Sequence, residues 1–222
     1  MLLPSTLLAK SPSNKMRFAS LFLFGCALVS AATTPTDKIV KKLQKIEKLS
    51  QDAIPKVNKL TVEDGNRLNE TSGRFQNIFK AFDKIYDVSG EVTAIIVGLP
   101  SPFDADGSAA VRDAFSLLQI AHSDFLSALI DKSDLYSANN AVKAAVTERV
   151  NIVSSEAINM SLGIAILDKS TAADGRVITK LRGSLARDIQ AVRRYYRTRG
   201  VAVMGLSVVA PRRDGNTRFL SC

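Results

Sequence analysis

SAAVRDAFSLLQIAHSDFLSALIDK, residues 108–132, is the stretch that most clearly predicts the fold of this 222-residue chain. Its apolar residues recur at alternating intervals of four and three, which places them on one face of an α-helix. This stripe consists of Val111, Phe115, Leu118, His122, Phe125 and Leu129. At about 1.5 Å per residue the helix is roughly 37 Å long. A helix of this length cannot bury such a stripe alone, so it needs partner helices with matching stripes.

Four other stretches carry stripes of the same kind, and we expect them to be the partner helices. They are residues 33–60, 69–90, 137–170 and 171–199. For residues 137–170 the predicted stripe is Val146, Val150, Val153, Ala157, Met160, Ile164 and Leu167. The sequence therefore predicts an all-α fold, a bundle of about five amphipathic helices.

Capping residues and a proline predict where the helices begin and break. The candidate caps, in chain order, are Thr34 or Thr36, Asp106 or Ser108, and Thr171 or Asp174. Pro55 interrupts the first stripe, and we expect it to kink that helix or to divide it near Ala53.

Residues 16–32, MRFASLFLFGCALVSAA, have the pattern of a secretory signal peptide. Arg17 precedes an apolar run of about 12 residues, shorter than the ~20 that a membrane-spanning helix needs. Small residues allow cleavage after Ala31 or Ala32, and the chain can start at Met1 or at Met16. We expect an upstream extension plus a cleaved signal peptide in 1–32, a helical-bundle domain in 33–199, and a disordered tail in 200–222. The predicted localisation is extracellular.

The formal net charge of +9 is unevenly distributed. Residues 182–222 contain nine Arg and two Asp, whereas residues 33–181 carry about −1. Because the basic character belongs to the last fifth of the chain and does not coat the domain, nucleic acid is not expected as a partner. The only cysteines, Cys26 and Cys222, cannot supply a disulfide framework, so the domain must be held together by core burial.

No motif assembles an active site, a metal site or a cofactor site, and the chain is predicted not to be an enzyme. No Gly-x-Ser-x-Gly elbow or cysteine nucleophile accompanies His122, the one histidine. The acidic stretch 102–113 resembles a calcium loop, but Pro102 occupies the first ligand position. His122 is interpreted as a buried core residue, with a contact to a ligand head group as the alternative.

Two further sets of residues are candidates for function. The sequons at Asn69 and Asn159 match the N-glycosylation pattern. Phenylalanines concentrate on two predicted helices, where they either pack a core or line an apolar ligand space. The candidate lining residues are Phe75, Phe79, Phe82, Phe115, Leu118, His122, Phe125 and Met160.

The chain resembles the fungal hydrophobic surface-binding protein A family, also called cell wall galactomannoproteins. The resemblance rests on residues 37–60, on the helix 110–132 with its Leu129-Ile130-Asp131-Lys132-Ser133 ending, and on residues 150–169. It implies a wall-associated all-α protein that binds hydrophobic surfaces or lipids such as fatty acids, and it leaves cell-wall polysaccharide as a further partner. The alternative is a structural or host-interaction bundle without a ligand cavity. The sequence does not predict the oligomeric state.

Overall fold

The computed structural model describes residues 34–68, 70 and 73–197. Within these ranges all regular structure is helical, which confirms the all-α prediction. The long helices are α1 (Pro35–Asn58), α3 (Arg74–Val97), α4 (Ala105–Asp131) and α7 (Ala172–Tyr195). A fifth rod runs unbroken through α5 (Asn140–Arg149), the π-helix η2 (Val150–Leu162) and α6 (Gly163–Lys169). Two short helices, α2 (Val62–Asn66) and the 3-10 helix η1 (Ser133–Tyr136), lie in the connections.

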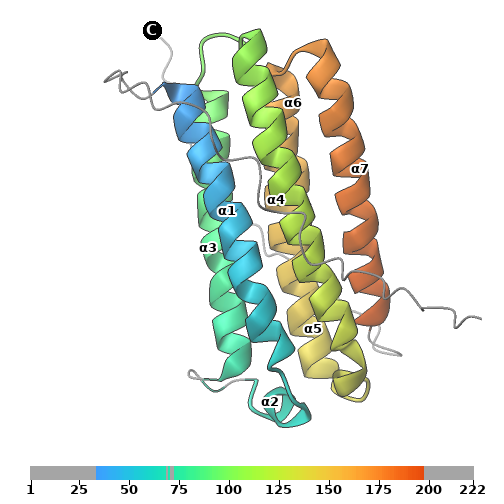
Figure 1. The fold of residues 1–222 in the computed structure, drawn as a ribbon. Helices are drawn as coiled ribbons and strands as arrows, with labels where there is room; N and C mark the ends of the chain where they lie inside the picture. The colour runs from blue at the N-terminus through green and yellow to red at the C-terminus, as the bar shows by residue number, and fades with distance from the viewer. Residues whose placement is uncertain (1–33, 69, 71–72, 198–222) are drawn as a thin grey trace, which may run out of the picture. The chain divides into compact units, whose positions relative to one another are not determined.

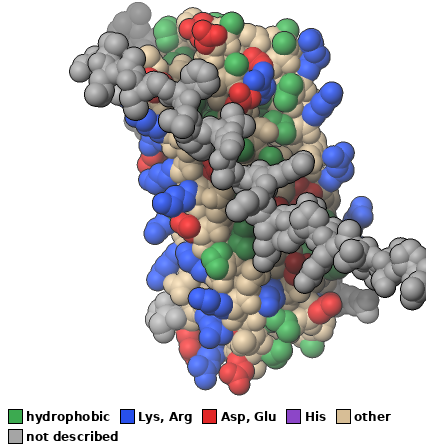
Figure 2. Space-filling view, in the orientation of Figure 1, with side chains coloured by type: hydrophobic (Ala, Val, Ile, Leu, Met, Phe, Trp, Pro, Cys, Tyr) green, Lys and Arg blue, Asp and Glu red, His purple; other side chains and the backbone are tan. Residues whose placement is uncertain are grey.

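Five rods pack side by side as a closed ring (Figure 1). Helix α1 contacts α3 and α4, and α4 contacts α7. The fifth rod closes the ring, because η2 contacts both α7 and α3. Lys and Arg side chains line the margin of the bundle over α1 (Figure 2). The amphipathic pattern thus turns one face of every rod toward a shared interior.

The helix starts follow local capping chemistry. Thr34 caps α1 as predicted: its Oγ1 accepts from Asp37 N at 3.1 Å, and Asp37 Oδ2 accepts from Thr34 N at 3.0 Å. Thr171, one of the two predicted candidates, caps α7. The prediction for α4 was wrong, because Asp104 caps it by accepting from Gly107 N at 2.7 Å.

Pro55 does not divide α1, which continues to Asn58. Of the two predicted effects of Pro55, a kink or a division near Ala53, the division is therefore wrong. Pro55 is exposed and lies in the last turn of α1.

The predicted inward stripe of α4 is fully buried, and so are the apolar residues that recur along α1, which are Ile39, Leu43, Ile46, Ala53 and Val57. The stripe predicted for residues 137–170 is wrong at Met160 and Ile164. Met160 is 50% exposed and Ile164 is 46% exposed, whereas Ile158 and Leu162 are fully buried. The reason is the π-helix: its hydrogen bonds join residues five apart instead of four, so the inward face moves away from the α-helical spacing.

The rod Asn140–Lys169 is, within the described residues, long and apolar enough to cross a membrane by length and composition alone. Half of the residues in its most apolar 18-residue stretch are buried in the bundle. A core helix meets the same criterion, so the observation is weak support for a membrane span. The predicted signal peptide, the predicted tail and Asn69 lie outside the described residues.

Candidate functional site

The candidate lining residues meet in the interior, on α3 and α4. The seven that are buried are Phe75, Phe79, Phe82, Phe115, Leu118, His122 and Phe125. Phe82 of α3 and Phe125 of α4 approach to 4.9 Å between ring centroids, which joins the two helices through an aromatic pair. The eighth candidate, Met160, lies on the outer side of η2. The structure therefore brings seven of the eight residues into one apolar core.

One end of this core is closed by other aromatic and basic groups. Phe75 packs against Tyr136 of η1, with centroids 5.2 Å apart. The Arg149 guanidinium lies 5.4 Å from the Phe79 ring centroid and also pairs with Asp83. A cation above an aromatic face adds stabilisation to the apolar contact. An apolar ligand that enters from this end must displace these groups.

His122 joins three rods in the middle of the core. Its Nδ1 is 3.0 Å from Ser50 Oγ of α1, and its Nε2 is 2.9 Å from Ser154 Oγ of η2. A neutral imidazole has one donor and one acceptor nitrogen, so the two serines satisfy both of its polar groups. This matches the interpretation of His122 as a core residue, although contact with a head group stays a prediction.

Burial determines the protonation of His122. The side chain is fully buried, and the loss of hydration lowers its pKa from 6.5 to about 4. The ring is therefore neutral near pH 7. The sequence analysis placed His122 in an inward stripe but did not identify Ser50 or Ser154 as its partners.

Asn159, the sequon residue on η2, faces α7. Its backbone oxygen accepts from Arg182 Nε at 2.9 Å. Its Oδ1 is buried and has no hydrogen-bond partner among the residues that the structure describes. Glycosylation at Asn159 stays a prediction, and it requires this half-buried side chain to become accessible.

A polar cluster fastens the start of α7 to α4. Asp174 Oδ2 accepts from Ser108 Oγ at 2.7 Å and from Thr171 Oγ1 at 2.9 Å, and Asp174 Oδ1 accepts from Arg112 Nη1 at 2.6 Å. The hydrogen bond from Ser108 is the main cause that lowers the pKa of Asp174, followed by those from Thr171 and Arg112. Ser108, proposed from the sequence as the cap of α4, thus supports the cap of α7.

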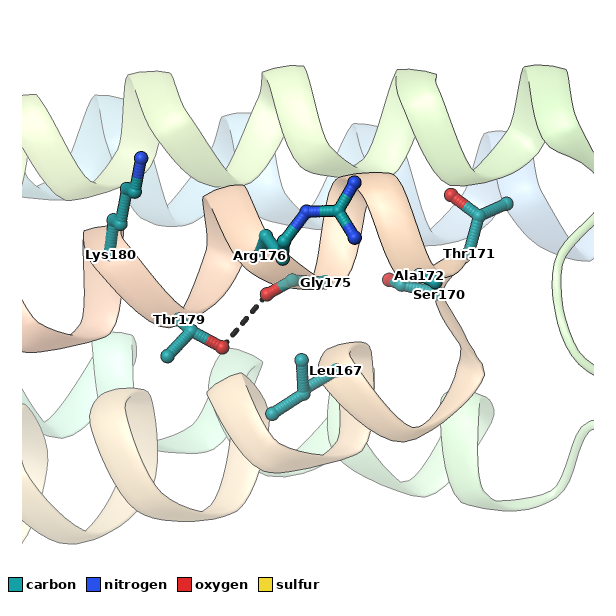
Figure 3. A pocket seen from close by; sticks show the side chains of 8 residues that line it. All are labelled: Leu167, Ser170, Thr171, Ala172, Gly175, Arg176, Thr179 and Lys180. Carbon is teal, nitrogen blue, oxygen red and sulfur yellow. Dashed lines mark hydrogen bonds between the residues drawn. The ribbon is translucent and has the colours of Figure 1, made fainter.

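Grooves mark the described surface of the bundle. The groove between α3 and η2 has a volume of about 590 Å³ and carries Asp87, Glu91 and Glu156. The groove between α6 and α7 has a volume of about 450 Å³ (Figure 3). Its lining residues are Leu167, Ser170, Thr171, Ala172, Gly175, Arg176, Thr179 and Lys180. Neither groove is lined by any of the eight candidates, and sequence reasoning missed both.

Within the described ranges, no group of three or more His, Cys, Asp or Glu side chains is placed to hold a metal ion. The arrangement that the structure does present is an apolar interior with one satisfied polar bridge, surrounded by surface grooves.

Comparison with known proteins supports the fold. No family model matches the chain, and no curated protein matches it. The structure of AfMp4p in complex with palmitic acid superimposes with a TM-score of 0.64 at 18% identity, over 72% of this chain and 99% of that one. Ligand binding domain 1 of the Penicillium marneffei MP1 protein, complexed with arachidonic acids, has a TM-score of 0.54 at 12% identity, over the same shares of the two chains. The chain therefore has the fold of these two domains.

Proposed function

We propose that this protein binds fatty acids or similar single-chain lipids and does not catalyse a reaction. The observation that carries the proposal is the fold, which is shared over almost the full length of two domains that were solved with fatty acids. The seven buried candidates give the interior the apolar character that an acyl chain requires. Met160 is a candidate for contact with a hydrophobic surface, because its side chain is half-exposed.

The proposal extends to location and family. The signal-like residues 16–32 support secretion, and the motifs in residues 37–60, 110–132 and 150–169 support membership of the hydrophobic surface-binding protein A family. Wall association and adsorption to hydrophobic surfaces follow from that membership. Amphipathic rods can lay their apolar faces on such a surface when the bundle opens.

The second candidate function is a structural or host-interaction bundle without a ligand. It is favoured by the contact between Phe82 and Phe125 and by the complete hydrogen bonding of His122, since both describe a packed interior. A bundle of this kind binds partners through its outer faces.

Titration of the delipidated chain with palmitate separates the two functions. We expect heat in calorimetry and a rise in melting temperature, because a ligand that binds only the folded state stabilises it by about 2.7 kcal/mol at a hundred times its dissociation constant. Native mass spectrometry of the chain as purified would detect a lipid that is already bound. If neither heat nor a thermal shift appears, the packed-bundle function replaces lipid binding.

A further inference from the structure

Two basic side chains form one edge of the α6–α7 groove. Arg176 and Lys180 are four residues apart on α7, so they are neighbours on the helix surface. Both leave α7 on the same side in Figure 3. Both are exposed, and the described residues supply neither with an ion-pair partner. Like charges at this spacing destabilise a helix, and a bound anion would remove that repulsion.

Asp174, the acidic residue nearest in sequence to Arg176 and Lys180, does not form an ion pair with either of them. The Asp174 carboxylate is directed toward α4, where Ser108 and Arg112 hold it. Among the described residues, no acid is therefore paired with Arg176 or Lys180.

The hydroxyl groups that line the groove already donate hydrogen bonds within the protein. Their hydrogen bonds run from Ser170 Oγ to Ile166 O (2.7 Å), from Thr171 Oγ1 to Asp174 Oδ2 (2.9 Å) and from Thr179 Oγ1 to Gly175 O (2.8 Å). The side-chain donors that remain for a ligand are those of Arg176 and Lys180. An anionic acceptor makes the strongest hydrogen bonds with these two cations.

The floor of the groove is apolar and depends on a glycine. Leu167 of α6 lies against Gly175 of α7, where an added Cβ would meet Leu167 Cδ1 at 3.2 Å. Gly175 thus allows the two helices to approach closely, and Ala172 adds a further small apolar side chain. The groove has a volume of about 450 Å³ and is shallow and open to solvent.

We propose that Arg176 and Lys180 bind the carboxylate of a fatty acid, with the adjoining part of its chain on the floor formed by Leu167, Ala172 and Gly175. The inference rests on the proposed function and adds to it the position of the head group. Two cations beside an apolar floor discriminate between an acid and a neutral lipid of the same chain length.

Calorimetric titration of the full chain with palmitate and with hexadecanol tests this assignment. The test variant is Arg176→Gln/Lys180→Gln. Its matched control is Arg187→Gln/Arg194→Gln, which removes the same charge from exposed positions of α7 outside the groove. We expect the test variant to bind palmitate about fivefold more weakly than the control, with the difference decreasing at high salt. Hexadecanol should bind both variants equally.

Each other outcome has a defined meaning. Equal palmitate affinity of the two variants overturns the head-group site but leaves lipid binding intact. An equal loss of affinity for palmitate and hexadecanol in the test variant also overturns the head-group site. Arg176 and Lys180 would then contact the hydrocarbon chain of the ligand and not its carboxylate. If the wild-type protein binds neither compound, the proposed function itself is wrong.

Discussion

His122 sets the pH dependence of stability at the residue scale. Its pKa is about 4 in the folded chain and about 6.5 when it is exposed by unfolding, so between these values the unfolded state binds the additional proton. The free energy of unfolding should therefore fall as the pH falls through this window. Between pH 7 and pH 5 we expect a loss of about 2 kcal/mol, measured by urea unfolding at both values.

The His122→Asn variant is the control for this prediction. The chain has a single histidine, and the pKa values of the hydrogen-bonded carboxyls Asp64 and Asp174 are lowered, which keeps their titration below this window. An Asn amide can take the place of His122 Nδ1 and bond to Ser50, but it is too short to replace Nε2, so the variant should be less stable at pH 7. The assignment fails when the variant and the wild-type protein lose the same free energy between pH 7 and pH 5.

At the element scale, the π-helix determines which side chains of the fifth rod face the core. Ile158→Ala should lower the free energy of unfolding by about 2–5 kcal/mol, because Ile158 is fully buried. Met160→Ala should change it by less than about 0.5 kcal/mol, because half of that side chain is exposed. Urea unfolding of both variants measures the two effects. The opposite order would mean that the rod keeps the α-helical register through residues 150–162.

The helices differ in how much of their structure could be predicted from the sequence. For α1 and α4 the prediction succeeded because each has a dominant apolar stripe, and the burial of that stripe leaves one register. The fifth rod has two overlapping stripes, one through Ile158 and Leu162 and one through Met160 and Ile164. Packing against α3 and α7 determines which of the two stripes is buried, and the local sequence pattern does not predict it.

Only part of the candidate site could be predicted from the sequence, as was also the case for the helices. The clustering of phenylalanines on two helices predicted the aromatic core, because residues that share a helical stripe must share an environment. The α6–α7 groove was not predictable, since it arises where Gly175 meets Leu167 across two helices. A glycine inside the amphipathic pattern of residues 171–199 was the one local signal for that close approach.

For the whole molecule, the proposed binding of a fatty acid allows two positions for its acyl chain, inside the ring of rods or on the surface. The rods form a ring, and large side chains from α3 and α4 fill its interior. An acyl chain inside the ring must occupy the volume of one of these side chains or separate the rods. An acyl chain on the surface requires neither. A void made inside the ring should therefore change the stabilisation by the ligand only if the acyl chain lies inside.

Phe82→Ala makes such a void, and it should cost about 3–5 kcal/mol of stability because the Phe82 side chain is fully buried against Phe125. If the acyl chain enters the ring, it replaces lost contacts, so saturating palmitate should raise the melting temperature of this variant more than that of the wild-type protein. Leu60→Ala is the control, since Leu60 is buried just beyond the end of α1. Differential scanning calorimetry with and without palmitate measures all three shifts. Equal shifts in the three proteins would place the acyl chain on the surface of the bundle.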